Sequence, residues 1–254
     1  MSSSRVPVSV VICTYNGSKF IRSQILSILS VLNPNDQVIV SDDCSSDNTV
    51  EIINSLRDHR IKTCINNTNL GYAKNFLQTL SSAEHNFIIL ADQDDIHSPH
   101  SISSATEALS SGFDLYIGSM LLTNSSGTPQ VFLGFPSNRK IYRWDLIQRF
   151  LLVIRLFLGV NYAFGCAMSI KKSSYQRLLR PLPLQVYPPH DILLFLYSLL
   201  CFKKIFLSSS VHLLHRIHCS NASPLVSKRK FHVKIRQRLT LIHYLLSSFT
   251  STHS

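Results

Sequence analysis

Three aspartates, Asp92, Asp94 and Asp95, are the residues best placed for chemistry, because they directly follow a run of five apolar residues, 87–91. Such a run is typical of a strand buried on both faces of a sheet. Ligands of open α/β sheets bind just beyond the carboxyl ends of such strands. Three like charges held together are unfavourable unless a cation neutralises them. The pattern therefore predicts a site for a hard divalent cation, Mn²⁺ or Mg²⁺, with phosphate oxygens as further ligands.

Further polar clusters follow each of the other apolar runs in the first hundred residues. They are Thr14-Tyr15-Asn16, Asp42-Asp43 and Asn69-Gly71-Lys74-Asn75. Because the carboxyl ends of parallel strands meet at one edge of a sheet, we expect these clusters and the aspartates to form one cleft. Asp42 or Asp43 is suited to accept a hydrogen bond from a base imide or a ribose hydroxyl. Tyr15 is suited to flank the base.

The elements that must position these residues alternate between strands and helices. Strands are expected over residues 6–13, 37–41, 60–65 and 87–91, and helices over 18–32, about 46–56 and 72–81. This order predicts a doubly wound parallel sheet with right-handed crossovers. The pattern is looser after residue 112. We expect strands over 114–122 and 164–170, a helix over 142–158, and a proline-rich loop before an apolar helix over 192–202.

Charge is divided unevenly along the 254 residues, whose net charge is +11. Twelve of the fourteen acidic residues lie at or before Asp114, whereas 18 of the 25 Lys and Arg residues follow it. The first half is therefore suited to a metal and a nucleotide, and the second half to an anionic partner. We divide the chain into an acidic first half (1–114), a basic second half of the same domain (115–222) and a basic amphipathic tail (223–254).

The tail predicts contact with an anionic membrane surface. Residues 228–238 carry six Lys and Arg residues and no acid, and an apolar stretch, 239–249, follows. This pattern suits anionic headgroups. No apolar run reaches the roughly 18–20 residues of a membrane span, and we see no signal peptide. We therefore expect a cytoplasmic protein that associates at most peripherally with the membrane. Basic residues are not clustered with aromatic ones, so we expect no nucleic acid partner.

Two common nucleotide motifs are missing from the chain. No G-x-G-x-x-G follows the first strand, and no G-x-x-x-x-G-K-[ST] is present. The dinucleotide-binding Rossmann and P-loop interpretations therefore lose support. Any nucleotide phosphate would instead be held through metal on the aspartates.

Several segments resemble the successive motifs of the family 2 glycosyltransferases, which use nucleotide sugars and have the GT-A fold. The resemblance extends over about residues 6–220 and is most specific in the first hundred. Within this family, the chain resembles the bacterial rhamnosyltransferase-like branch, which builds surface polysaccharides such as O-antigen. The matching segments are VSVVICTYNGSKFIRSQILSIL, VIVSDDCSSDNTVEII, NLGYAKNFLQTL and IILADQDDIHSP, followed by FGCAMSI, PPHDILL and LLHRIHCSN.

The resemblance implies that residues 1–114 are the nucleotide-sugar-binding half and residues 115–222 the acceptor-binding half of one domain. It also implies a role for individual residues. Thr14, Tyr15 and Asp43 would contact the base and ribose, and Asp92 and Asp94 would form the D-x-D pair at ribose and metal diphosphate, with Asp95 adjoining. Asp191 would be the catalytic base, His218 would reach the metal or the diphosphate, and Arg216 would reach the phosphates. The implied reaction is metal-dependent and inverting. It moves a sugar from a nucleoside-diphosphate sugar to a saccharide or lipid-linked saccharide.

Asp191 also qualifies as a base without the resemblance. Displacement at an anomeric carbon needs a carboxylate that deprotonates the acceptor hydroxyl, and Asp191 is the only acid after Asp145. An N-cap of the following helix is the alternative role. The residues after it, Ile192 and Leu193, depart from the aromatic residues usual in the family. Two other functions therefore stay open: a catalytically degenerate GT-A binding protein at the membrane, and a sugar-phosphate nucleotidyltransferase.

Overall fold

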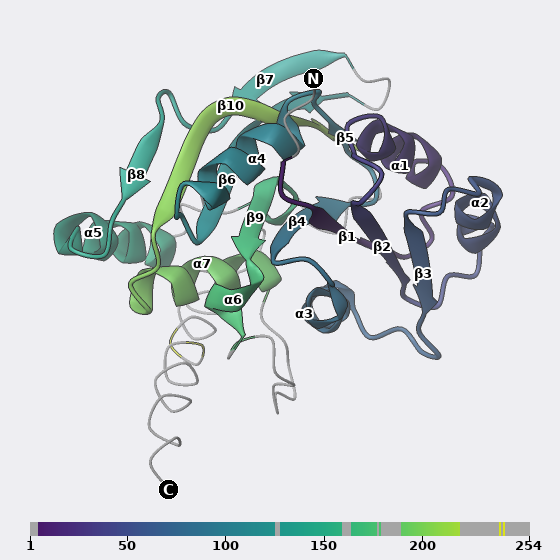
Figure 1. Cartoon of the computed structure of the whole chain (residues 1–254), viewed down its shortest axis with the longest axis horizontal. Helices are drawn as coiled ribbons and strands as arrows, with labels where there is room; N and C mark the ends of the chain where they lie inside the picture. Colours follow the sequence, from purple (N-terminus) through teal and green to yellow (C-terminus); the bar gives the residue numbers. More distant parts are fainter. Residues whose placement is uncertain are drawn as a thin grey trace, which may run out of the picture.

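A single mixed sheet runs through the protein. The computed structural model describes residues 5–124, 128–158, 164–176, 178, 189–218, 239 and 241. Ten strands in this part of the chain form the sheet, in the order β3-β2-β1-β4-β9-β6-β10-β5, with β7 paired to β6 and β8 to β10 (Figure 1). The proposed tail, 223–254, lies outside the described residues except for 239 and 241, as does most of the proline-rich loop.

The first half of the sheet is the predicted parallel one. Its strands are β1 (Val8–Thr14), β2 (Gln37–Asp42), β3 (Ile61–Ile65) and β4 (Phe87–Asp92). They pair in parallel, and β1 lies between β2 and β4. The connecting helices are α1 (Ile21–Leu29), α2 (Thr49–Ser55) and α3 (Tyr72–Ser82). These elements lie where the sequence pattern predicts them. β1, β2 and β4 are buried along nearly all of their length, as continuous apolar runs predict, whereas β3 is a more exposed edge strand.

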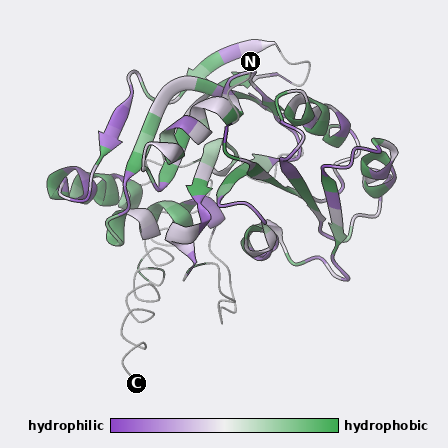
Figure 2. Ribbon diagram, viewed as in Figure 1, coloured by the Kyte–Doolittle hydropathy of each residue, from purple (hydrophilic) through white to green (hydrophobic). Residues whose placement is uncertain are grey.

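The helices form two layers, one on each face of the sheet. Successive residues of β1 point to opposite faces. Val10 and Ile12 pack with α1, α2 and α4 (Ser101–Ser110), whereas Val11 packs with α3 and with α7 (His190–Leu200). Figure 2 shows the hydrophobic residues concentrated in the central strands. The fold class predicted from the sequence, a doubly wound sheet flanked by helices, is confirmed.

The second half of the sheet is mixed. β9 (Met168–Lys171) is antiparallel to both β4 and β6 (Leu115–Thr123), and a short 3₁₀ turn, Gly165–Ala167, precedes it. The expected strand over 164–170 therefore starts later than predicted. The long strand β10 (Ile205–Arg216) runs parallel to β6 and antiparallel to β5 (Ile96–His97). Shorter elements complete this half: β7 (Pro129–Leu133), β8 (Arg139–Ile141) and α6 (Lys172–Tyr175).

Helix α5 (Leu146–Phe157) projects from the end of the sheet next to β8 and is anchored by one buried arginine. The Arg149 guanidinium donates to the carbonyl oxygens of Ser198 and Leu199 at 3.0 and 3.1 Å, at the carboxyl end of α7. It also donates to the carbonyl oxygens of Tyr142 and Lys203. One side chain therefore supplies the donors for four carbonyl groups and fixes α5 against α7.

We expect Arg149→Met to destabilise the fold by about 2–4 kcal/mol, because a methionine fills part of the volume but leaves four carbonyl groups without their donor. Urea unfolding followed by circular dichroism measures the change. Arg155→Met, on the exposed side of the same helix, is the control and should change stability by less than about 0.5 kcal/mol. Equal effects of the two substitutions would show that Arg149 does not anchor α5.

Candidate active site

The acidic cluster lies at the carboxyl end of β4, next to the carboxyl end of β1. Asp92, Asp94 and Asp95 each offer a carboxylate oxygen, and these three oxygens lie within 4.8 Å of one another. Burial raises the pKa of Asp92 well above its usual range, and the charges of Asp95 and Asp94 raise it further. The pKa of Asp94 is raised by burial and by Asp95 in the same way. The cluster thus places three carboxyl groups close together in a buried position, where negative charge is unfavourable.

The cluster fits a hard divalent cation. Its donors are carboxylate oxygens, which Mg²⁺ and Mn²⁺ prefer. Asp95 is fully buried, and its Oδ2 has no hydrogen-bond partner among the described residues. A buried carboxylate oxygen without a donor is costly unless a cation binds it. The Sγ atom of Cys166 and a ring nitrogen of His215 also lie within 4.8 Å of a carboxylate oxygen of Asp95. Burial raises the pKa of the Cys166 thiol, and Asp95 raises it further, so this sulfur remains a neutral thiol.

Two histidines from the end of β10 contact the cluster. His218 Nε2 donates to Asp94 Oδ2 at 2.9 Å, and its ring stacks on Phe20. His215 Nδ1 donates to Asp95 Oδ1 at 2.8 Å. Burial alone would lower the pKa of His215, but the hydrogen bond to Asp95 and the charges of the three aspartates outweigh it and raise the pKa to about 9. His218 is thus placed beside the predicted metal site, and His215 is a site residue that the sequence analysis missed.

Arg216 holds the acidic turn in place. Its guanidinium donates to the carbonyl oxygens of Asp94 and Asp95 and to the hydroxyl of Ser23, and it lies over the ring of Phe20. The side chain is only 8% exposed. In this conformation Arg216 positions the acidic turn against α1. Its contact with the phosphates stays a prediction.

Hydrogen bonds connect the turn after β1 with the turns after β4 and β2. Gln93 Oε1 accepts hydrogen bonds from Thr14 Oγ1 at 2.6 Å and from the Tyr15 backbone N–H at 2.9 Å. The Asn16 backbone N–H donates to the hydroxyl of Ser45, and its side-chain oxygen accepts from the Ser46 N–H. This leaves the Tyr15 ring on the surface, 47% exposed, where a base can stack.

Gln93 and Gly17 contribute to the candidate site, although the sequence analysis gave neither residue a role of its own. A Cβ at Gly17 would lie 2.4 Å from Gln93 Oε1 and 2.7 Å from Thr14 Oγ1, so only glycine permits this close approach. For both residues, the position in the sequence was a signal that could have indicated the role. Gly17 lies in the Tyr-Asn-Gly turn, and Gln93 lies between the aspartates.

Asp42 and Asp43 organise the neighbouring loops. Asp42 is fully buried, and its two oxygens accept hydrogen bonds from the backbone N–H and the hydroxyl of Ser45. Asp43 Oδ1 accepts from Asn66 Nδ2 and the Leu70 N–H, and its Oδ2 accepts from the Gly71 N–H. Since a carboxylate oxygen accepts two hydrogen bonds, Asp43 Oδ2 retains one acceptor position. Lys74, half-buried in the first turn of α3, follows this loop.

Asp191 lies in the first turn of α7, close enough to Asp92 for its charge to raise the pKa of that carboxyl. It is half-buried, and its Oδ1 accepts from the backbone N–H of Ile192 at 2.8 Å. The N-cap of α7 is Pro189, so Asp191 is not the cap. The fold thus brings this acid, about a hundred residues further along the chain, beside the acidic cluster.

His190 fixes the start of α7 through apolar packing. Its ring is buried, stacks on Phe76 at 4.0 Å between ring centroids, and meets the edge of Tyr72. A Cβ on Gly165 would lie 2.4 Å from His190 Nε2, so the 3₁₀ turn approaches the ring closely. Burial lowers the pKa of His190 to about 3, which makes the ring neutral. His190 therefore positions Asp191 by packing rather than by charge.

The comparisons with known proteins agree with this geometry. Residues 9–179 match the model of the family described as glycosyl transferase family 2, and the chain belongs to this family. The prediction of a glycosyltransferase is thereby confirmed at the level of the family.

Two curated relatives each match a little more than a third of the chain. An Escherichia coli protein named UDP-Glc:alpha-D-GlcNAc-diphosphoundecaprenol beta-1,3-glucosyltransferase WfaP is 36% identical over 35% of this chain and 35% of its own length. The putative teichuronic acid biosynthesis glycosyltransferase TuaG of Bacillus subtilis is 30% identical over 37% of this chain and 38% of its own. The matches thus span about a third of the length of these relatives.

A solved structure confirms the GT-A fold. The crystal structure of residues 1–349 of Staphylococcus aureus TarS in complex with UDP-GlcNAc superposes with a TM-score of 0.70. It is 20% identical, and the superposition covers 93% of this chain and 66% of that one. Within the described residues, no helix is both long enough and apolar enough to cross a membrane.

Proposed function

We propose that this protein transfers a sugar from a nucleoside-diphosphate sugar to a hydroxyl group of a saccharide or lipid-linked saccharide in the synthesis of a surface polysaccharide. The observation that carries the proposal is that Asp191, in the first turn of α7, lies close enough to the cluster of Asp92, Asp94 and Asp95 for its charge to raise the pKa of Asp92. A donor held by the cluster would thus lie near a candidate base. The related proteins are named for transfer to a lipid-linked GlcNAc and for teichuronic acid synthesis, which supports this class of acceptor.

The donor would bind across the ends of β1, β2 and β4. Tyr15 would stack on the base, and the remaining acceptor position of Asp43 would receive a base or ribose donor. Thr14, Asn16 and Asp42 would hold the two loops that shape this pocket, and Lys74 would contribute positive charge near it. Asp92, Asp94 and Asp95, with His218 beside Asp94, would hold Mn²⁺ or Mg²⁺, which when bound neutralises the charge of the diphosphate.

Asp191 would act as the general base. Its carboxylate would take the proton of the acceptor hydroxyl while that oxygen attacks the anomeric carbon. The bond from this carbon to the diphosphate oxygen breaks at the same time, and the configuration inverts. The hydrogen bond from the Ile192 N–H to Asp191 Oδ1 would help to orient this carboxylate. The buried ring of His190 would keep this carboxylate in place.

A thermal-shift panel tests the donor site. UDP, TDP and GDP are each added with and without Mn²⁺ or Mg²⁺. A nucleotide at about 100 times its Kd stabilises a protein by roughly 2.7 kcal/mol, which raises Tm by a few degrees. We expect a shift with one nucleotide that requires the metal. UDP is the first candidate, because UDP sugars are named for the relatives. Absence of any shift would contradict a donor site, and release of pyrophosphate from a nucleoside triphosphate would indicate a nucleotidyltransferase instead.

A further inference from the structure

Helix α5 presents an apolar face to solvent. Six large apolar side chains of the segment 146–158 are exposed: Leu146, Ile147, Phe150, Leu151, Ile154 and Leu158. Their spacing places them along one side of the helix. Ile147 is 78% exposed and Phe150 is 65% exposed, although such residues are normally buried. In Figure 2 this projecting helix carries hydrophobic residues, as the central strands do.

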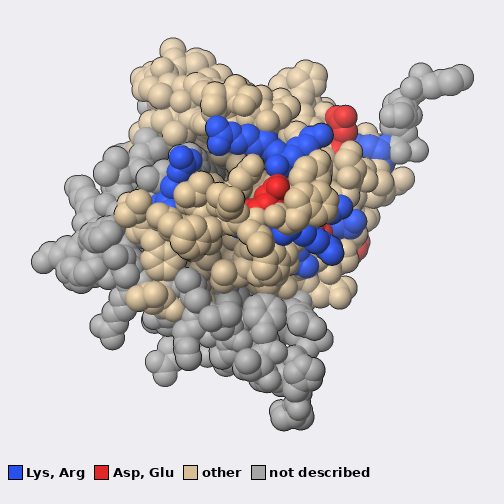
Figure 3. All heavy atoms as spheres, turned by 90° about the vertical axis from the view of Figure 1, so that its left-hand side faces the viewer, with Lys and Arg blue, Asp and Glu red and all other residues tan. Residues whose placement is uncertain are grey.

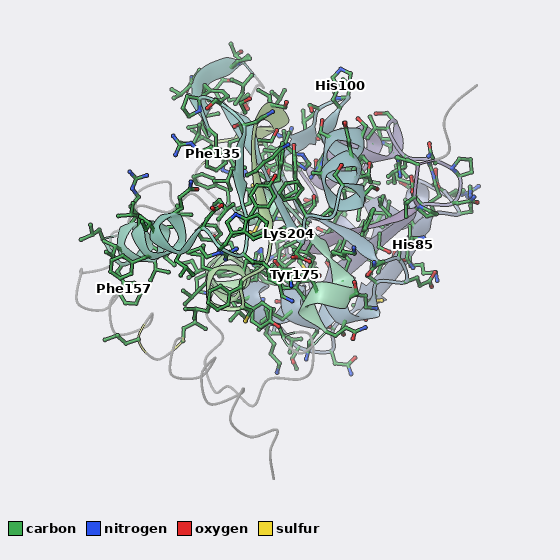
Figure 4. All side chains as sticks on the ribbon, turned by 60° about the vertical axis from the view of Figure 1, so that its left-hand side comes forward. His85, His100, Phe135, Phe157, Tyr175 and Lys204 are labelled. Carbon is green, nitrogen blue, oxygen red and sulfur yellow. The ribbon has the colours of Figure 1, made fainter. Side chains whose placement is uncertain are left out.

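The face is not simply a displaced part of the core. The opposite side of α5 already packs on the protein, because Leu156 is buried in the same cluster as Leu193 and Leu196 of α7. The buried Arg149 fixes this orientation through its hydrogen bonds to the end of α7. In Figure 4, Phe157 lies on α5 at the margin of the molecule, well apart from Tyr175 in the interior. The exposed side therefore points away from the domain that holds it.

Positive charge surrounds the apolar face. Arg139, Lys140, Arg143 and Arg155 are exposed on β8, on the turn before α5 and on α5 itself. Figure 3 views the molecule from this end, and Lys and Arg side chains are spread across it, with few acidic ones. Asp145 is the one acid of the described segment 139–158, and its Oδ2 accepts a hydrogen bond from the Tyr142 N–H.

An aromatic pair lies at the amino end of the face. Trp144 is 72% exposed and stacks on Tyr142, with 5.1 Å between ring centroids and an interplanar angle of 6°. Tryptophan and tyrosine are enriched where hydrocarbon meets water, because their rings are apolar and their N–H or O–H groups need a polar partner.

We infer that α5 is a membrane-docking helix, which lies in the surface of a bilayer that contains anionic phospholipid. Its apolar face would enter the boundary between headgroups and acyl chains, and the surrounding arginines and lysines would contact the phosphates. A second copy of this chain fits less well, because two such faces would bring their positive charges together. The docking inference does not depend on the proposed transfer reaction, since it rests on α5 and its neighbours alone.

Through Arg149, the inferred docking surface is fixed relative to the candidate active site. This side chain joins α5 to the carboxyl end of α7, and Asp191 lies in the first turn of that same helix. A bilayer on α5 would therefore hold Asp191 at a constant position relative to the lipid surface. Such an arrangement suits an acceptor that is itself carried by a lipid.

The single tryptophan of the chain makes a site-specific test possible. The full-length protein is mixed with vesicles of phosphatidylcholine, with or without phosphatidylglycerol, and with lipids whose acyl chains are brominated. We expect a blue shift of Trp144 emission and its quenching by the brominated lipid. Both effects should be stronger with phosphatidylglycerol and weaker at high salt. Unchanged emission of the wild-type protein with every vesicle would overturn the inference.

A matched pair of variants separates α5 from other apolar surface. Ile147→Glu/Phe150→Glu should reduce vesicle partitioning by about tenfold or more. The control, Val131→Glu/Phe132→Glu, changes one aliphatic residue and one phenylalanine on β7, which are 56% and 46% exposed. It should bind vesicles as the wild type does. Equal loss in both variants, or full binding by the α5 variant, would overturn the inference. So would a wild-type dimer, measured without lipid, that the α5 variant converts to a monomer.

Discussion

Replacing Asp191 with asparagine should reduce the rate of sugar transfer by about 100- to 10,000-fold, the usual contribution of a general base. Asparagine keeps the shape of the side chain and can still accept the Ile192 N–H, but it cannot take a proton. Donor affinity should change little, because the base acts on the acceptor. The expected signature is therefore a fall in kcat with an unchanged metal-dependent thermal shift by the nucleotide.

The control for this substitution is Asp145→Asn, which changes the other acid of the basic half. Asp145 precedes α5 and accepts the Tyr142 N–H, and asparagine is equally good at a helix N-cap. Transfer is followed as acceptor-dependent release of nucleoside diphosphate from sugar derivatives of the nucleotide that gave the thermal shift. If the Asp191→Asn enzyme turns over as fast as the Asp145→Asn enzyme, Asp191 is not the base.

Asp94→Asn should weaken metal-dependent nucleotide binding by at least about tenfold, because it removes one negative charge from the three carboxylates that would hold the cation. Isothermal titration with the nucleotide at fixed Mn²⁺ concentration measures the change. The same nucleotide without metal should bind both proteins equally weakly. Unchanged affinity in the presence of metal would rule out Asp94 as a ligand.

Stability distinguishes this effect from simple unfolding. The pKa of Asp94 is raised in the folded protein by burial and by Asp95, so ionisation of this carboxyl costs more in the folded protein than in the unfolded chain. Neutral asparagine should therefore leave the Tm of the metal-free protein unchanged or raise it, while nucleotide binding falls. Asp58→Asn is the control. Asp58 pairs with Arg60 at the start of β3, away from the cleft, and its loss should not change the affinity for nucleotide.

Helix α4 shows where local sequence information was insufficient. Residues 101–110 contain four serines and only a few apolar residues, so no helix was predicted there. In the structure Ile102, Ala105 and Leu109 are buried against the sheet. Tertiary packing thus determines this helix, because serine has a low intrinsic preference for helix interiors. The same holds for β5, β7 and β8, which are short and form only because neighbouring strands offer free edges.

The sequence by itself determined the parallel half of the sheet and the acidic cluster at its edge. Buried runs such as 87–91 can form only central strands, and the polar residues after them must then meet at one edge. Only the tertiary structure decided which later residues join them. The antiparallel pairing of β10 with β5 brings His215 and Arg216 to Asp94 and Asp95, and the packing of α7 brings Asp191 there.

The sequence likewise did not determine in which direction the apolar face of α5 points. The sequence predicts a helix over 142–158 but gives no partner for its apolar side. Periodicity shows that a helix has an apolar side, but it does not show what that side contacts. The hydrogen bonds of Arg149 to α7 turn that side outward, and such long-range contacts depend on the assembled fold rather than on any local pattern of residues.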